Sequence, residues 1–381
     1  MSLPDFDFSE VLRRMVETKA SDVHITPGFP PAMRDKGKIQ PLEGFPVLNS
    51  QQTREVVYGI LNDDQRKRFE NNQQLDFAYA IPGVARFRVN CFFQRGTVSA
   101  AFRLVPQEIP ALDSLGVPQV LRELCEKPRG FVLVTGPTGS GKSTTLAAMI
   151  DVINSGHQDH ILTIEDPIEF LHQHKRSIVN QREIGSDAAD FSLGLRAALR
   201  EDPDVILVGE MRDLETISTA LTAAETGHLV FATLHTQSTA QTVDRIIDVF
   251  PPEQQGQVRT QLSIALQGIV TQQLLPTSDG RGRAVACEVL IPTPAVRNLI
   301  REGKTHQIYA ALQTSGAVGM QTMDADLARL VRGGKITRSL AEQRASVPEE
   351  LGRLLGGAPA VPAQAAPVAD TAPPPAYVQG G

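Results

Sequence analysis

Short apolar runs alternate with segments of helical spacing in the second half of this chain. The runs FVLVT, HILTI, DVILV and HLVFATL lie between residues 131 and 234. Strands that are almost continuously apolar and rich in β-branched residues, and that alternate with helices, are typical of a parallel sheet covered on both faces. We therefore expect an α/β fold here, with a parallel-rich sheet.

The first hundred residues follow another pattern. Residues 11–19 have helical spacing, with the apolar side chains of Val11, Leu12, Met15 and Val16 on one side. Alternation of apolar and polar residues predicts half-buried antiparallel strands over residues 22–26, 75–81, 85–93 and 98–104. This pattern predicts a small α+β domain over residues 1–104.

Helical spacing resumes after Pro252. Val258, Leu262, Ala265, Leu266 and Ile269 recur at intervals of three or four residues. Residues 296–300 and 327–331 also have helical spacing. We expect a helical C-terminal part that completes a second domain over residues 119–355.

Two stretches of unusual composition mark boundaries. The proline-rich segment at 105–118 predicts an interdomain linker. Residues 356–381 are mostly Ala, Pro and Gly, and such a segment has too little apolar surface to offset the entropy of ordering. We expect a disordered tail there.

Composition and charge narrow the function classes. The chain has 381 residues, with 37 Lys and Arg against 43 Asp and Glu, which gives a net charge of −6. This mild acidity argues against a dedicated nucleic-acid coat. The chain starts without a secretory signal, and no segment approaches the roughly 18 apolar residues of a membrane span. We expect a cytoplasmic protein that meets a membrane only through a protein partner.

The three cysteines, Cys91, Cys125 and Cys287, are far apart in the sequence. They form no C-x-x-C pair, so their spacing predicts neither a disulfide framework nor a zinc site. A reducing compartment is the simplest interpretation.

The strongest motif lies between a predicted strand and a predicted helix. Residues 136–143, GPTGSGKS, match G-x-x-x-x-G-K-[ST] in full. Glycines let backbone N–H groups surround phosphates, and the helix N-terminus adds positive potential. Lys142 would meet the β- and γ-phosphates, and the Ser143 hydroxyl would complete a Mg²⁺ shell. We predict that ATP and Mg²⁺ bind to Gly136, Pro137, Thr138, Gly139, Ser140, Gly141, Lys142, Ser143 and Thr144.

Carboxylates follow two of the predicted strands. Glu210 ends the strand DVILV, and position 209 is Gly where many enzymes of this fold have an Asp that holds the metal. We therefore assign the metal to Glu210, directly or through water. Three acidic residues within 165–169 (EDPIE) follow the strand HILTI, and one of them is the candidate base that orients the attacking water. An acidic surface turn is the alternative.

Two histidines lie at opposite ends of the strand HLVFATLH. A straight strand would separate His228 from His235 by roughly 23 Å, so they cannot contact the same phosphate. His235 follows the carboxyl end of the strand, where we expect it to sense the γ-phosphate. His228 fits an interface or a role at the start of the strand.

Arginines stabilise the charge that develops in phosphoryl transfer, and several are candidates here. Four lie in the second domain and four in the first, although most exposed arginines are simply solvated. They are Arg196, Arg200, Arg212, Arg245, Arg86, Arg88, Arg95 and Arg103.

Together these residues resemble a known family. The segments GPTGSGKST, ILTIEDPIEF, NQREIG, the long run from LRAALRED to ATLHT, and VDRIIDVFP are similar to those of the secretion-superfamily ATPases. Within that superfamily they resemble the type IV pilus retraction ATPases, the PilT group. The resemblance extends from the segment KASDVHITPGFPP to about Arg338 and leaves out the tail.

The resemblance implies roles for individual residues. Lys142 and Ser143 fall in the Walker A element, and Glu169 falls on the catalytic base of the family's Asp box. Glu210 falls on the Mg²⁺ role of an atypical Walker B element, in which Gly is usual at position 209. His228 and His235 match the His box, and we add Arg212 to the catalytic group.

The resemblance also implies an architecture. The family's fold is a RecA-like P-loop ATPase domain preceded by a PAS-like domain, and six copies form a ring. The PAS-like domain covers the nucleotide site and donates arginines, for which Arg86, Arg88 and Arg103 are the candidates for donation in trans. The segment FFQRGTVSAAFR, in the same domain, departs from the family's pattern.

One further segment separates subgroups of the family. AVRNLIRE, at residues 295–302, is similar to the AIRNLIRE segment that retraction ATPases need for retraction rather than for hydrolysis. Val296, Leu299 and Ile300 would form an apolar helix face, which leaves the charged residues exposed for coupling. The residues assigned to coupling are Arg297, Asn298, Leu299, Ile300, Arg301 and Glu302. Extension and secretion relatives usually carry a further N-terminal domain and a four-cysteine zinc motif, and we expect neither here.

The sequence therefore predicts a hexameric ATP-hydrolysing motor that powers type IV pilus retraction. Its implied partner is the platform protein of the pilus in the inner membrane, at the cytoplasmic face. Three alternatives remain open: an accessory retraction ATPase paralogue, a RecA-like nucleic-acid motor, and a nucleotide-regulated switch. The chain lacks the aromatic-interleaved basic stretch of the second and the guanine-reading N-K-x-D of a GTPase switch.

Overall fold

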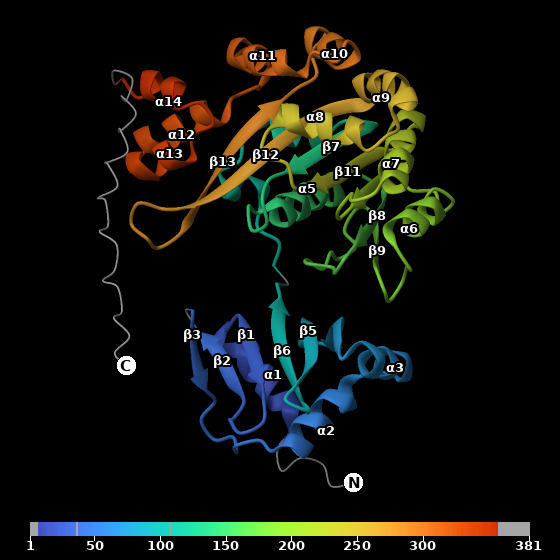
Figure 1. Cartoon of the computed structure of the whole chain (residues 1–381), viewed down its shortest axis with the longest axis vertical. Coiled ribbons are helices and arrows are strands. Elements are labelled where there is room, and N and C mark those ends of the chain that lie inside the picture. The colour runs from blue at the N-terminus through green and yellow to red at the C-terminus, as the bar shows by residue number, and fades with distance from the viewer. Residues whose placement is uncertain (1–6, 36, 107, 357–381) are drawn as a thin grey trace, which may run out of the picture.

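The computed structural model describes residues 7–35, 37–106 and 108–356, which form two bodies joined after strand β6 (Figure 1). The smaller body comes from the N-terminal part of the chain and the larger body from the rest. Apart from Gly356, the tail predicted at 356–381 lies outside the described residues.

The smaller body is a six-stranded antiparallel sheet with three helices. Its strands run in the order β3-β2-β1-β6-β5-β4, and its buried core includes Phe69, Phe87 and Phe102. Its elements are α1 (Phe8–Thr18), β1 (Asp22–Ile25), β2 (Ala32–Asp35), β3 (Lys38–Pro41), α2 (Ser50–Ile60), α3 (Asp63–Asn72), β4 (Gln74–Ile81), β5 (Ala85–Gln94) and β6 (Thr97–Val105).

The helix and four strands predicted in this region are confirmed. The elements that the pattern did not predict are β2, β3, α2 and α3. All of β3 is exposed, so it has no apolar alternation, and α3 buries only Phe69 on an otherwise polar helix. The two helices begin at caps instead: Asn49 accepts the backbone N–H groups of Gln51 and Gln52, and Asn62 accepts that of Gln65.

The larger body is built on a seven-stranded sheet in the order β13-β12-β7-β11-β10-β8-β9. All neighbouring pairs are parallel except β12 and β13. Its elements up to the last strand are η1 (Leu112–Leu115), α4 (Val120–Cys125), β7 (Gly130–Thr135), α5 (Lys142–Gly156), β8 (His160–Glu165), β9 (Ile178–Glu183), α6 (Phe191–Ala198), β10 (Val205–Val208), α7 (Leu214–Thr226), β11 (Leu229–Leu234), α8 (Thr239–Asp248), α9 (Pro252–Ala265), β12 (Leu266–Pro276) and β13 (Arg283–Leu290).

The parallel-rich sheet and the α/β class are confirmed, and the four predicted runs are strands β7, β8, β10 and β11. The helical pattern predicted through Ile269 is wrong at its end. Helix α9 stops at Ala265, where Leu266 takes an extended conformation (ψ 131°) and begins β12. Because β12 is buried on both faces, its sequence does not alternate between apolar and polar residues, and Leu266 and Ile269 continue the helical spacing of α9.

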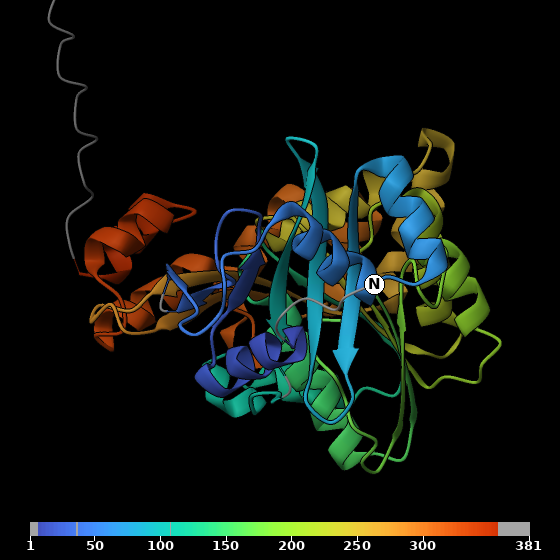
Figure 2. The same cartoon turned by 90° about the horizontal axis from the view of Figure 1, so that it is seen from below.

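Two apolar clusters cover the faces of this sheet. One cluster packs α6–α9 against one face of the sheet, and the other packs α4 and α5 against the opposite face. In Figure 2, which views the molecule from below, the smaller body lies in front of the larger one. A third cluster joins the β12–β13 hairpin to the last helices. The remaining elements are α10 (Pro294–Arg301), η2 (Thr305–Gln307), α11 (Ile308–Thr314), η3 (Gly316–Val318), α12 (Met323–Arg332), α13 (Arg338–Arg344) and α14 (Pro348–Leu354).

The structure shortens the linker predicted at 105–118. Strand β6 continues through Val105, and Leu112 is buried in the cluster beneath α4 and α5. Ile109, Leu115 and Val117 pack against the same cluster. Most of the proline-rich segment therefore belongs to the larger body, because its apolar residues find a surface there.

No helix in the described part of the chain combines the length and the apolar character needed to cross a membrane.

Candidate functional site

The phosphate loop connects β7 to α5 and is shaped by glycine. Gly139 and Gly141 have φ of +79° and +90°, a region that residues with a side chain rarely adopt. At Gly136 a Cβ atom would lie 2.3 Å from the Gln272 carbonyl oxygen. The loop therefore needs glycine both for its conformation and for its close approach to β12.

Lys142 begins helix α5 and is largely buried. Its ammonium group donates to the carbonyl oxygens of Gly136 and Pro137 at 2.9 and 3.2 Å. Burial lowers the pKa of Lys142, and the nearby carboxylates of Glu210 and Glu169 oppose that effect. Both acidic residues assigned from the sequence therefore lie close enough to act on this lysine.

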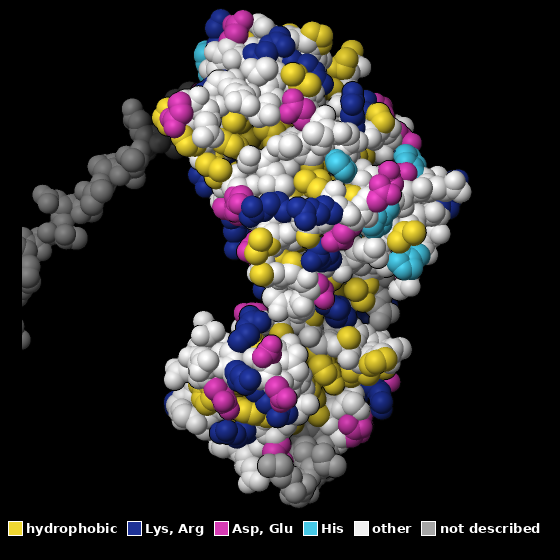
Figure 3. Space-filling model, turned by 90° about the vertical axis from the view of Figure 1, so that its right-hand side faces the viewer, with side chains coloured by type: hydrophobic (Ala, Val, Ile, Leu, Met, Phe, Trp, Pro, Cys, Tyr) yellow, Lys and Arg dark blue, Asp and Glu magenta, His cyan; other side chains and the backbone are white. Residues whose placement is uncertain are grey.

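A cavity of ≈ 540 Å³ opens between the phosphate loop and the carboxyl ends of the strands, near the hollow between the two bodies that Figure 3 shows. Polar and charged residues from five different segments meet in it, as expected at the carboxyl edge of a parallel sheet. The charged or polar lining residues are Arg88, Thr138, Lys142, Ser143, Thr144, Glu165, Asp166, Glu169, His172, Glu210, Arg212, Thr233 and His235.

Glu210 is held through both carboxylate oxygens. Arg212 donates to Oε2 at 2.6 Å, and the His235 ring lies 3.0 Å from Oε1. Burial alone would raise the pKa of Glu210, but the hydrogen bond from Arg212 and the charges of both partners outweigh it and lower that pKa. The carboxylate is therefore kept ionised at the end of β10.

Gly209 has a steric reason to be glycine. A Cβ atom at this position would lie 3.1 Å from the Ile164 carbonyl oxygen and 3.2 Å from the Cα atom of Glu165. Thr233 adds a hydrogen bond from its hydroxyl to the Gly209 carbonyl oxygen at 2.5 Å. A side chain at 209 would therefore require the end of β8 to yield by a few tenths of an ångström, which shows how closely β8 and β10 approach here.

The loop that follows β8, which we call the acid loop (residues 165–169), presents two carboxylates differently. Glu165 accepts hydrogen bonds from Thr163 at 2.6 Å and from Gln181 at 3.1 Å. Burial raises its pKa in spite of these bonds. Glu169 is exposed, and its backbone N–H donates to a Glu165 carboxylate oxygen at 3.5 Å.

The two histidines lie at opposite ends of β11. The His235 ring faces Glu210 in the cavity. The His228 ring contacts the Ala223 carbonyl oxygen at 3.0 Å, near the end of α7. The structure therefore puts His235 with the other candidate residues and places His228 apart from them.

The arginines have distinct positions. Arg212 lies in the cavity beside Glu210, and Arg88 lines the cavity from the smaller body, 3.9 Å from Asp76. Arg103 pairs at 2.9 Å with Asp22, within its own sheet. Arg86 pairs at 2.7 Å with Glu183 of the same chain. Of the three first-domain candidates, only Arg88 reaches the cavity within one chain.

The segment at 295–302 forms helix α10 and the residue after it. Val296 and Ile300 are fully buried, and Leu299 is partly buried against the same cluster. Arg297, however, is not an exposed residue: its guanidinium donates to the carbonyl oxygens of Ser263 and Ile264 at the end of α9. Arg301 and Glu302 are exposed, so the expectation of exposure was wrong for Arg297 alone.

Sequence reasoning missed His172 as a residue of the cavity. Burial lowers its pKa to about 4, so the ring is neutral at pH 7. Phe170, Phe191 and Leu274 also line the cavity and provide apolar surface. No motif marks these residues; only their nearness to the acid loop or to a strand end could have suggested them.

Comparisons with known proteins agree with this geometry. Residues 67–337 match the model of the family described as Type II/IV secretion system protein. The type IV pilus retraction ATPase PilT of Pseudomonas aeruginosa is 52% identical over 343 residues, which cover 90% of this chain and 99% of that protein. The type IV pilus ATPase PilU of the same organism is 45% identical over 87% of this chain and 86% of its own length.

A solved structure is similar as well. The crystal structure of the pilus retraction motor PilT with bound ADP superposes with a TM-score of 0.86 at 50% identity, over 92% of this chain and all of that one. The chain therefore belongs to the Type II/IV secretion system protein family, in which its resemblance to the pilus retraction ATPases is confirmed.

Proposed function

We propose that this protein is an ATP-hydrolysing motor that powers type IV pilus retraction. The observation that carries the proposal is the meeting of the phosphate loop, Glu169 and Glu210 in one cavity. It is supported by 52% identity to a protein named as a pilus retraction ATPase and by likeness to a retraction motor with bound ADP.

We assign roles to six side chains of the cavity. Lys142 and the loop amides bind the phosphates, and the exposed Glu169 carboxylate accepts a proton from the attacking water. His235 and Arg212 hold Glu210 ionised and oriented. Arg88, which lines the cavity, adds positive charge toward the phosphates.

The residues present fit a Mg²⁺ ion. Ser143 and Glu210 supply oxygen atoms, the ligands that Mg²⁺ prefers, in the same cavity. Among residues 7–35, 37–106 and 108–356, no three His, Cys, Asp or Glu side chains form a metal cage. When bound, Mg²⁺ would neutralise charge on the transferred phosphoryl group.

The proposal extends to assembly and place. The protein would act as a homohexamer at the cytoplasmic face of the inner membrane, against the platform protein of the pilus. The exposed part of α10, Asn298, Arg301 and Glu302, would transmit the motion. His228, at the far end of β11, would serve an interface rather than the nucleotide.

An accessory retraction ATPase paralogue is the second candidate. The 52% identity to a protein named as a pilus retraction ATPase favours the main motor. A nucleic-acid motor has no comparable support, and we expect no stimulation of ATP hydrolysis by DNA.

Measurements on the purified protein test the class of enzyme and its assembly, and a gene deletion tests its role in the cell. Purified protein should show slow Mg²⁺-dependent ATP hydrolysis, and mass photometry should show hexamers. Deleting the gene alone should abolish twitching and raise surface piliation. Normal twitching after deletion would instead assign the accessory role, and hydrolysis that rises with DNA strand length would support the nucleic-acid motor.

A further inference from the structure

Glu183, the last residue of β9, joins the two bodies of the molecule. Its side chain is only 3% exposed. One oxygen atom, Oε2, accepts a hydrogen bond from Arg86 of the smaller body at 2.7 Å and another from the backbone N–H of Ile168 at 3.1 Å. A single buried carboxylate therefore contacts a strand of the first body and a loop of the second.

The loop partner is the acid loop. Ile168 comes directly before Glu169, and its own side chain is buried (4% exposed). Its amide is thus a fixed point from which the exposed Glu169 side chain projects. A shift of the Glu183 carboxylate would move this amide, and Glu169 with it.

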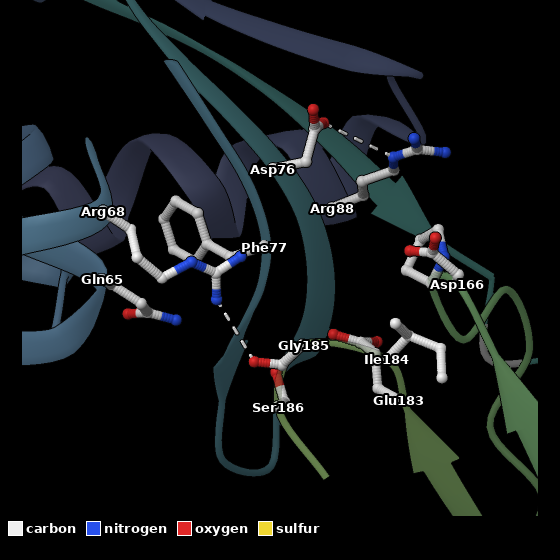
Figure 4. Close-up of a pocket in the computed structure, with 11 residues that line it drawn as sticks. Gln65, Arg68, Asp76, Phe77, Arg88, Asp166, Glu183, Ile184, Gly185 and Ser186 are labelled. Carbon is white, nitrogen blue, oxygen red and sulfur yellow. Dashed lines mark hydrogen bonds and ion pairs between the residues drawn. The ribbon is translucent and has the colours of Figure 1, made fainter. Parts of the chain in front are cut away.

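The turn after Glu183 is closed by a hydrogen bond and makes a second contact between the bodies. Asp187 accepts the Glu183 backbone N–H at 2.8 Å, which closes the turn. Arg68 of α3 donates to the Gly185 carbonyl oxygen at 3.3 Å. Figure 4 shows Arg68 reaching this carbonyl from the smaller body. Two arginines of the smaller body therefore contact the larger one here: Arg86 at the end of β9 and Arg68 at the turn that follows.

The same contact borders a small gap. A cavity of ≈ 50 Å³ lies between the bodies, and Arg88, Asp166 and Glu183 are among its lining residues (Figure 4). Arg88 and Asp166 also line the larger cavity. The acid loop thus lies between the nucleotide cavity and an interface that is not closely packed, where small shifts of the first body can be accommodated.

We propose that Glu183 is a positioning residue for ATP hydrolysis, through which the placement of the first body sets the position of the acid loop. This rests on the proposed function, in which Glu169 is the base. Arg86 then acts within its own chain, by holding Glu183. The Glu183 carboxylate is buried and Arg86 is partly buried, and a hydrogen bond between charged groups is roughly twice as strong as one between neutral groups, which suits such a link.

The test uses the full-length protein with Arg86→Gln, which breaks the ion pair but leaves the bond to Ile168 available. We expect kcat to fall about tenfold to a hundredfold because the base is misplaced, with KM for ATP unchanged. Hydrogen exchange at the Ile168 amide should become faster. Glu183→Ala should lower kcat at least as much, and the double variant should be no slower than Glu183→Ala.

The matched control is Arg182→Gln. Arg182 precedes Glu183 on the same strand, pairs with Glu201 at 2.8 Å and donates to the Asp187 carbonyl oxygen at 3.0 Å, so that both of these contacts stay within the larger body. Its loss should leave both kcat and exchange at Ile168 at wild-type values. An equal fall of kcat in this variant would show a general effect of disturbing β9 and would overturn the proposal.

Two further outcomes separate this proposal from the assignment of the base. In a Glu169→Gln background, Arg86→Gln should cause no further fall, and a full additional fall would overturn the positioning role. If Glu169→Gln alone hydrolysed ATP at the wild-type rate, the assignment of the base would fail. Hydrogen exchange at the Ile168 amide in Arg86→Gln would still show whether the first body controls the position of the acid loop. If exchange and kcat were both unchanged in Arg86→Gln, the proposal that the first body controls this loop would be wrong.

Discussion

The two acidic segments of the cavity position their carboxylates by opposite means. At the end of β10, Glu210 is held by its own side chain, which pairs with Arg212 and His235. On the acid loop, Glu169 is exposed, and the loop is anchored instead through the buried Ile168 and its bond to Glu183. The first arrangement suits a fixed anion near a metal, and the second suits a base that must meet water.

The same contrast appears in α10. Arg297 is engaged by two carbonyl oxygens at the end of α9, whereas Arg301 is exposed. One short motif therefore contains an arginine that supports the fold and another that is exposed to a partner.

The largest effect should come from the exposed carboxylate. Glu169→Gln should lower ATP turnover by about 10² to 10⁴, the usual contribution of a general base. Binding of a fluorescent ATP analogue should be retained, since Lys142 and the loop remain. Wild-type turnover in this variant would remove Glu169 as the base, and the contrast with Glu210 would lose its meaning.

Loss of the Glu210 carboxylate should have a smaller effect on ATP turnover, and it should act through the requirement for Mg²⁺. Glu210→Gln should raise the Mg²⁺ concentration for half-maximal turnover by about 10- to 100-fold, because a neutral amide holds the metal, directly or through water, less well than a carboxylate. A Mg²⁺ titration of the steady-state rate measures this. His228→Ala, at the other end of β11, is the control and should leave the titration unchanged.

Stability tests whether the end of β10 is the rigid side of the comparison. Gly209→Asp should lower the free energy of unfolding by about 1–3 kcal/mol, because the added atoms crowd β8. Urea unfolding followed by circular dichroism measures the change. A stability equal to the wild type would mean that β8 yields easily and that the steric reason for Gly209 is wrong.

Substitutions of the two arginines of α10 should differ in their effect on the free energy of unfolding, measured by the same urea unfolding. Arg297→Ala leaves carbonyl oxygens at the end of α9 without their donor, so we expect a loss of about 1–3 kcal/mol. Arg301→Ala should stay within about 0.5 kcal/mol, keep ATP turnover and block twitching. Unchanged twitching in the Arg301 variant would count against its role in coupling.

The sequence predicted the parts of this structure that local patterns encode. The phosphate loop is continuous in the chain, and the buried strands β7, β8, β10 and β11 are short apolar runs between helices. Because parallel strands end at one edge of the sheet, the meeting of Lys142, Glu210 and His235 followed from their positions at strand ends.

Other features depend on contacts between distant segments. The spacing of β12 gave no sign of a strand, because burial on both faces removes the alternation that marks one. The carbonyl groups that Arg297 contacts lie 33 and 34 residues earlier in the chain. Arg86 and Glu183, which pair with each other, are 97 residues apart. No local pattern records such pairs.

By itself, the sequence determined the family, the phosphate-binding chemistry and which acidic residues follow the strands. The tertiary structure alone decided which charged side chains are engaged and which are exposed. The physical reason is that the hydrogen-bonding state of a charged side chain depends on the groups folded around it. Glu169 and Glu210 are the same amino acid, and they differ because one meets solvent and the other meets Arg212 and His235.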